Sequence, residues 1–412
     1  MRADKLTLLA VALTALTSVS GFAQTLRPSS DPELRGKDLA TLSEQAHSGN
    51  TEAQLRLGLA FQYGRGVDRS IAEAMKWYRR AANYGNPAAQ TTLAYLCETG
   101  AEGPPNPAEA AKWYLRAAVS GFQTAEFNLG LLYLRGKGVQ KSDEEAAHWI
   151  GKAADAGNAM ALATLAYLYK TGQGVPKDPG KALRLTRKAA KKHNPEAERG
   201  LGSFYAEGKV VPVDRAKAGK WYARAAKSYM KAAEAGDARA QLGLASMYED
   251  GVGVAKDLRQ ALQLYRLAAE QGLSQAQAKI GEMYEEGVGG SKDYNQAAGW
   301  YRRAIAQGET GAANRLAALL AHGQGISLDL QQALKLWTWA ADKGNPYAQF
   351  NLANMYMTGV GVRQDFSKAH SLFILAGRSV DVSKELEYLP PRSTRRCCRW
   401  LRLRPRWLSD GL

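Results

Sequence analysis

The stretch AQLRLGLAFQYGRGV at residues 53–67, followed by IAEAMKWYRRAANYG at residues 71–85, decides the fold because it recurs along the chain. Its opening alanine returns every 36 residues, apart from one step of 43 between the fifth and sixth copies. The nine copies open at Ala53, Ala89, Ala125, Ala161, Ala197, Ala240, Ala276, Ala312 and Ala348. A fixed period of this length is typical of a repeat protein whose stacked units share one continuous core.

Two further positions predict that each copy is a pair of helices. Eleven residues after the opening alanine, every copy has a glycine, which can adopt positive φ and end the first helix. Seventeen residues after it, every copy has a residue that can cap the second helix by accepting hydrogen bonds from its free N–H groups. These capping residues are Ser70, Asn106, Ser142, Asp178, Asp214, Asp257, Asp293, Asp329 and Asp365.

The second helix carries a packing pattern. Alanine stands at positions 21 and 28 after the opening alanine in all nine copies, and a large residue stands at position 24 between them. These three positions share one helical stripe, so the large residue is expected to fill the core. The large residues are Trp77, Trp113, Trp149, Leu185, Trp221, Leu264, Trp300, Leu336 and Leu372. The sequence therefore predicts an all-α solenoid of nine helix-turn-helix repeats over residues 50–380.

The N-terminus has the pattern of a signal peptide over residues 1–23. Arg2 and Lys5 precede the apolar stretch 6–19, and Gly21-Phe22-Ala23 fits a cleavage site. The alternative is an uncleaved membrane anchor. No later stretch has 18 consecutive apolar residues, so we expect no transmembrane span after cleavage and a periplasmic or secreted product. Residues 24–49 are expected to form a linker and a lone capping helix, beginning near residue 34.

The repeated string resembles the Sel-one-like repeat (SLR), a relative of the tetratricopeptide repeat. The resemblance rests on Ala53-Gln54, Leu57-Gly58, Gly64-Arg65-Gly66-Val67, Ala74, Trp77-Tyr78, Ala81-Ala82 and Gly85. It implies a right-handed superhelix whose concave face is lined by the first helices. It also implies adaptor, scaffold or regulatory binding in secretion, envelope polysaccharide export, virulence or signalling, without shared catalytic residues.

Because the repeated residues serve the fold, partner binding is expected where the copies differ. On the first helices, the exposed positions near 3, 6 and 10 after the opening alanine should line the inner face. Tyrosine and asparagine there suit contact with a peptide or a glycan, since they offer both area and hydrogen bonds. The candidate partner-binding residues are Arg56, Leu59, Tyr63, Tyr95, Asn128, Leu131, Tyr167, Asn351 and Asn354.

Two copies depart from the pattern in ways that suggest further contacts. The fourth has His193 where a glycine should follow its second helix, and that helix bears a basic stripe, either for anion contact or as an ordinary solvated face. The stripe consists of Lys181, Arg184, Arg187, Lys188, Lys191 and Lys192. In contrast, the first helices of the sixth and seventh copies end with acidic pairs, Glu249-Asp250 and Glu285-Glu286. The 43-residue fifth copy is expected to have a longer second helix, which either projects to a partner or is a tolerated length variant.

No catalytic or metal-binding pattern is present in the sequence. The five histidines lie far apart without metal-ligand spacing, and the Gly-x-Gly loops follow predicted helices rather than strands, unlike phosphate-binding loops. Cys97 stands where seven of the other eight copies have an aromatic residue, which suggests a small buried side chain. We therefore expect neither an enzyme nor a bound cofactor.

The tail at residues 381–412 departs from the repeat. Its last part, from Pro391, contains seven arginines, two tryptophans and Cys397-Cys398, which fits either a membrane-contacting helix or a shifted reading frame, and we expect it to be disordered. The net charge of +16 favours anionic partners, although an exported protein meets little nucleic acid. The predicted function is an exported scaffold that binds a protein or peptide segment in the bacterial envelope. The alternative is a factor that binds an anionic polysaccharide or peptidoglycan.

Overall fold

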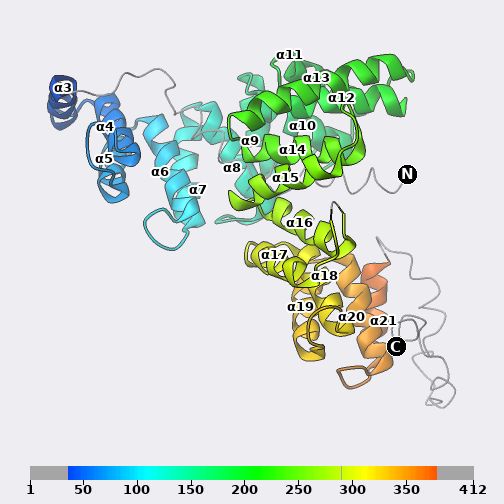
Figure 1. Ribbon diagram of the computed structural model, residues 1–412. Helices are drawn as coiled ribbons and strands as arrows, with labels where there is room; N and C mark the ends of the chain where they lie inside the picture. Colours follow the sequence, from blue (N-terminus) through cyan, green and yellow to red (C-terminus); the bar gives the residue numbers. More distant parts are fainter. Residues whose placement is uncertain (1–35, 289, 378–412) are drawn as a thin grey trace. The chain divides into compact units, whose positions relative to one another are not determined.

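The computed structural model of the chain describes residues 36–377 except residue 289. Within these residues the regular structure is α-helical, with no strand (Figure 1). The expected signal peptide at 1–23 and the tail at 381–412 lie outside the described residues. The helices fall into two compact units.

Unit 1 comprises, among the described residues, 36–237 and Val252–Val254. Its helices are α3 (Gly36–His47), α4 (Thr51–Tyr63), α5 (Ile71–Asn83), α6 (Pro87–Thr99), α7 (Pro107–Val119), α8 (Gln123–Arg135), α9 (Asp143–Asp155), α10 (Ala159–Thr171), α11 (Pro179–Lys191), α12 (Pro195–Glu207) and α13 (Arg215–Glu234). Unit 2 comprises, among the described residues, Ala238–Gly251 and 255–377. Its helices are α14 (Ala238–Asp250), α15 (Leu258–Glu270), α16 (Ser274–Glu286), α17 (Tyr294–Ala306), α18 (Thr310–His322), α19 (Leu330–Asp342), α20 (Pro346–Thr358) and α21 (Phe366–Ala376).

From α4 onward, each repeat is one pair of helices, with the even label for the first helix and the odd label for the second. Within a unit, each first helix packs against its own second helix and against the second helix of the preceding repeat. The all-α fold of nine two-helix repeats is therefore confirmed. Helix α3 precedes the repeats and packs against α4, burying Leu42 and Ala46.

The predicted helix ends are also confirmed. The nine glycines expected to end the first helices all have φ between 62° and 82°, the left-handed region that favours glycine. All nine predicted caps of the second helices accept hydrogen bonds from backbone N–H groups within three residues. These local contacts explain why the helices begin and end where the sequence indicated.

The prediction that the position-24 residue fills the core is wrong for most of the tryptophans. Trp113 is buried, whereas Trp77, Trp149, Trp221 and Trp300 are only half-buried. In each case the side chain of the arginine or lysine three residues later lies over the indole ring, at 4.5 to 5.6 Å from its centroid. These tryptophans therefore form the boundary between core and solvent.

The next residue, at position 25, is buried in eight of the nine copies, whereas Tyr222 in the fifth copy is half-buried. The tyrosines there in the first, second, sixth and seventh copies are buried, with at most 3% of their surface exposed. Their rings lie over the small residue of the first helix: a Cβ atom on Gly281 would lie only 2.4 Å from the ring of Tyr301. The tyrosine hydroxyl then reaches position 9 of the first helix, as in the 2.7 Å hydrogen bond from Tyr265 to Glu249. The core tyrosines are Tyr78, Tyr114, Tyr265 and Tyr301.

The glutamine of the Ala-Gln motif connects consecutive repeats. The Gln90 side chain is buried, and its amide Nε2 donates to the Ala82 carbonyl, at the end of the preceding helix, at 3.0 Å. Gln54 bonds the Ala46 carbonyl in the same way at 2.9 Å. Gln277 and Gln349 repeat this contact in unit 2. A buried carbonyl at a helix end thus gains a hydrogen-bond donor from the next repeat.

Glu126 occupies this position in the third copy, where a carboxylate cannot donate. Its side chain is buried, and its Oε2 has no hydrogen-bond partner among the described residues. Burial raises the pKa of Glu126, while Lys152 and His148 act in the opposite direction. Its charged form is therefore disfavoured in the fold, and the stability linked to its proton is lost as the pH rises through the raised pKa.

We expect Glu126→Gln to stabilise unit 1 at pH 7.5 by about 1–3 kcal/mol, because it restores the missing donor. The gain should shrink at pH 4, where the Glu126 carboxyl binds a proton and can donate. The measurement is urea unfolding of both proteins at the two pH values. Gln90→Glu, the reverse change in the second copy, should destabilise. A Glu126→Gln variant no more stable than the parent at pH 7.5 would contradict this account.

Helix α13 has 20 residues where the other second helices of unit 1 have 13, as expected for the longer fifth copy (Figure 1). However, its added residues do not simply project from the repeat. Tyr229 is only 1% exposed, and Ser228 donates to the buried Glu198 carboxylate of α12 at 2.6 Å. Of the two alternatives, projection therefore does not apply to Ser228 and Tyr229, which are held within the repeat.

His193 replaces glycine in the left-handed conformation that ends α11. Its φ of 58° is the only positive value of a residue other than glycine among the described residues. The imidazole Nδ1 lies 3.1 Å from the Arg224 guanidinium and 3.9 Å from Glu198 Oε1. Histidine tolerates this conformation better than most residues, and its ring joins the polar group around Glu198.

Candidate functional site

The first helices of unit 1 present a set of aromatic and apolar side chains, which we call the aromatic face: Leu59, Tyr63, Tyr95 and Tyr167. All four are half-buried, so each is supported by neighbours and still reaches solvent. Burial raises the pKa of Tyr95 and Tyr167, and Tyr63 adds to the effect at Tyr95, so the hydroxyls remain protonated donors. Such a face offers contact area with hydrogen-bond donors at its edge. Arg56, which was predicted with this set, is exposed on α4.

The exposure assumed for three candidate residues is wrong. Asn128, Leu131 and Asn354 are only 4%, 2% and 7% exposed. Leu131 belongs to the core of unit 1, and Tyr167, at the same position in the next copy, packs against that core. These three side chains therefore cannot contribute appreciable contact area to a partner in this conformation.

Asn351, on a first helix of unit 2, is already used inside the protein. Its Nδ2 donates to Asn314 Oδ1 at 2.9 Å, and Trp337 Nε1 donates to the same oxygen at 3.0 Å. The bond to Asn314 connects α20 to the first helix of the preceding repeat. Asn351 is therefore half-buried in a hydrogen-bond network, and binding a partner through its amide would require breaking this contact.

The first helices of unit 2 carry a ladder of ion pairs that the sequence analysis missed. Lys279 of α16 contacts Glu249 of α14 at 2.9 Å and Glu282 of its own helix at 3.3 Å. Arg315 of α18 contacts three carboxylates of α16. These are Glu282 at 3.2 Å, Glu285 at 3.3 Å and Glu286 at 3.6 Å.

The ladder partly neutralises the acidic helix ends predicted from the sequence. The sequence signal for these ion pairs is an acidic residue near the end of one first helix and, 30 residues later, a basic residue at position 3 of the next copy. Glu249 with Lys279 and Glu285 with Arg315 are the two examples. Neighbouring carboxylates raise the pKa of Lys279 and of Arg315 despite the opposing effect of burial, so both cations stay charged. Four carboxylates share two cations here, which leaves this face of unit 2 acidic.

The predicted basic stripe lies on α11. Arg184, Arg187, Lys188 and Lys191 are exposed, and none of them forms an ion pair within the part of the chain that the structure describes. Lys181 is different, because it is half-buried with its ammonium over the Tyr169 ring, 4.1 Å from the centroid. Lys192 is exposed directly after the helix.

The described residues offer little for chemistry. They contain no group of three or more His, Cys, Asp or Glu side chains placed to hold a metal ion. Cys97 is half-buried, and burial raises the pKa of its thiol, which makes it a poor nucleophile. None of the helices between residues 36 and 377 has the length and apolar character needed to cross a membrane.

Comparison with known proteins finds the Sel1 repeat nine times. The matched residues are 51–86, 87–121, 123–158, 159–194, 195–230, 238–273, 274–309, 310–345 and 346–380. No curated protein matches the chain significantly.

Among solved structures, a protective antigen of uropathogenic Escherichia coli that displays an SLR fold is 32% identical, over 82% of this chain and 79% of that one, with a TM-score of 0.43. A Sel1 repeat protein from Oxalobacter formigenes is 28% identical, over 91% of this chain and 92% of that protein, with a TM-score of 0.44. The nine consecutive matches span most of the sequence, and their boundaries follow the helix pairs, except that the fifth match ends four residues before the end of α13. The chain belongs to the Sel1 repeat family.

Proposed function

We propose that this protein is an exported scaffold of the bacterial envelope that binds a segment of another protein on the aromatic face of unit 1. Sel1 repeat proteins are generally non-enzymatic scaffolds for protein interaction. The observation that carries the proposal is the set of half-buried tyrosines on the first helices α4, α6 and α10, namely Tyr63, Tyr95 and Tyr167. Tyrosine is enriched where proteins bind each other because it supplies a rigid apolar surface together with a hydroxyl group.

The proposed location rests on the N-terminal pattern of residues 1–23. A charged start, an apolar stretch of 14 residues and a small-residue cleavage site are typical of exported proteins. A periplasmic or secreted scaffold would meet envelope proteins and their exposed segments. A regulatory, secretion-related or virulence-related role fits such a scaffold.

Photo-cross-linking in cells that produce the full chain tests this proposal. A photoreactive amino acid at position 95 or 167 should give discrete adducts with one protein, identified by mass spectrometry. The same amino acid at Arg79, exposed on the second helix α5, serves as the control. Adducts with peptidoglycan fragments or polysaccharide instead of protein would support the alternative of a glycan-binding factor. Equal labelling from position 79 would contradict a binding role for the aromatic face.

A further inference from the structure

The second helices α11 and α13 concentrate positive charge. Helix α11 has five basic residues and no acidic one, and α13 has six basic residues and one acidic residue, Glu234. They are the second helices of consecutive repeats, and α12 packs against both. The preceding second helix, α9, has four acidic residues and one lysine. The charge is therefore local to the fourth and fifth repeats.

The cations of the two helices occupy equivalent repeat positions. Arg184 and Lys220 both stand 23 residues after the opening alanine of their copies. Lys188 and Arg224 both stand at position 27, and Lys191 and Lys227 at position 30. Equivalent positions of stacked repeats point the same way, so the two sets face solvent together. Lys231, from the extension of α13, continues the same helical stripe. This basic surface consists of Arg184, Lys188, Lys191, Lys220, Arg224, Lys227 and Lys231.

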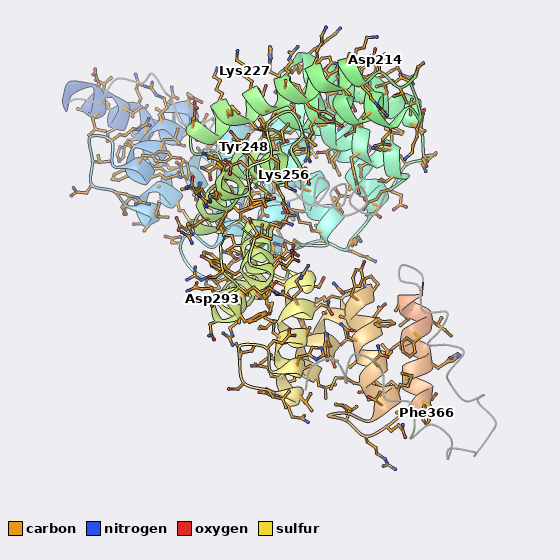
Figure 2. The ribbon with its side chains drawn as sticks, turned by 45° about the vertical axis from the view of Figure 1, so that its right-hand side comes forward. Asp214, Lys227, Tyr248, Lys256, Asp293 and Phe366 are labelled. Carbon is orange, nitrogen blue, oxygen red and sulfur yellow. The ribbon has the colours of Figure 1, made fainter. Side chains whose placement is uncertain are left out.

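The surface is exposed and its charge is largely uncompensated. All seven side chains reach solvent, and Figure 2 shows Lys227 on the outer edge of α13. Arg224 pairs with the buried Glu198, its Nε donating at 2.6 Å, and its side chain is still 43% exposed. The other six form no ion pair within residues 36–377. Cations spaced three or four residues apart on one helix repel each other and destabilise it slightly.

Helices α11 and α13 lack a glutamate that pairs with the position-23 lysine in other copies. In the first two repeats, the lysine at position 23 pairs with a glutamate three residues earlier on its own helix. Lys76 lies 2.6 Å from Glu73, and Lys112 lies 3.5 Å from Glu109. In α11 and α13, the equivalent of that glutamate is a lysine, Lys181 or Lys217. These two helices thus lack the internal counter-charge, which suits a surface whose counter-charge comes from a ligand.

The surroundings restrict the kind of ligand. Among the described residues, α11 and α13 bear none of the large exposed apolar side chains that anchor a protein interface or a membrane-bound helix. The Trp221 ring is half-buried, with the Arg224 guanidinium over it at 5.2 Å from the centroid, so it offers no open platform for stacking a nucleic-acid base. The surface therefore offers charge without apolar or stacking contacts.

We propose that the basic surface binds a linear acidic polysaccharide, whose regularly spaced carboxylate or sulfate groups supply the missing counter-charge. Each bound anionic group would release counterions from the polymer, so the interaction depends steeply on salt concentration. The site goes beyond the proposed protein-binding face, because it lies on second helices and uses other residues. The failure of either proposal leaves the other intact.

Titration of the full chain with polygalacturonate of defined length at low salt tests the proposal. We expect the triple variants Arg184→Gln/Lys188→Gln/Lys191→Gln and Lys220→Gln/Lys227→Gln/Lys231→Gln each to bind at least tenfold more weakly. The slope of log affinity against log salt should fall by roughly two to three in each. The control Lys76→Gln/Lys112→Gln/Lys335→Gln removes the same charge elsewhere and should bind like the parent.

Three results would overturn the proposal. They are the absence of polygalacturonate binding, an equal loss in the control variant, and tighter binding to a DNA duplex or to anionic vesicles than to the polysaccharide. Lysine acetylation of the unmutated chain gives a measurement free of folding effects. Polygalacturonate should protect Lys188, Lys191 and Lys227 at least threefold, while Lys112 and Lys335 react as before. Equal reactivity of all five lysines with and without the polymer would also overturn it.

Discussion

Gly174→Ala is expected to lower the free energy of unfolding by about 3–4 kcal/mol, because the loop has no room for a side chain. A Cβ atom on Gly174 would lie 1.9 Å from the carbonyl oxygen of Asp143, at the start of the preceding second helix. That oxygen belongs to the backbone and cannot move without shifting α9. Gly174 also has a φ of 66°, which adds strain for any other residue.

Gly121→Ala is the matched control for this prediction. Gly121 has a φ of 82°, and a Cβ atom there would have no neighbour within 4 Å. Gly121→Ala should therefore lower the free energy of unfolding by only about 1 kcal/mol, the cost of the left-handed conformation for alanine. Chemical unfolding of both variants, followed by circular dichroism, measures the difference. Equal losses would mean that the contact between the Gly-x-Gly loop and the preceding repeat does not stabilise the stack.

The second large effect is expected at Tyr301. Tyr301→Ala should cost about 3–5 kcal/mol, because it leaves a cavity over Gly281 and removes a fully buried ring. Trp300→Ala, one residue earlier, should cost clearly less, because the indole is half-buried under Arg303. Chemical unfolding in the full chain compares the two.

Tyr301→Phe separates the ring from the hydroxyl. Burial, together with the hydrogen bond to Glu285, raises the pKa of Tyr301, so the protonated hydroxyl donates to Glu285 Oε2, 2.5 Å away. Losing this bond should cost about 1–2 kcal/mol, well below the loss in the alanine variant. If Trp300→Ala lowered the free energy of unfolding more than Tyr301→Ala, position 24 would be the main core position, as the sequence predicted.

Most of the fold could be predicted because its determinants are local and occur nine times. The capping residues such as Asp214 and the helix-ending glycines such as Gly64 act within a few residues of themselves, so periodicity alone identifies them. The choice between Trp300 and Tyr301 as core residue depends on the rotation of the second helix against the first. Both positions carry large residues, and only the packing over Gly281 distinguishes them.

The candidate site was less predictable because it depends on contacts between repeats. Leu131 is buried in a core cluster that includes Leu162 and Leu165 of the next copy, and Asn351 is bonded to Asn314 of the preceding copy. The partners of Arg315 likewise lie 29 to 33 residues earlier. A reading of one copy at a time cannot find such pairs. A search for opposite charges about 30 residues apart would have found the ladder.

The central claim is that repeated positions maintain the fold while the aromatic face binds the partner. The most direct test is titration of the cross-linked partner segment, made as a synthetic peptide, against Tyr95→Ser/Tyr167→Ser. The control is Tyr84→Ser/Tyr347→Ser, which changes two tyrosines that are 69% and 51% exposed outside this face. We predict at least tenfold weaker binding by the first pair, normal binding by the control, and folded proteins in both cases. Unchanged affinity of a folded Tyr95→Ser/Tyr167→Ser variant would contradict the account.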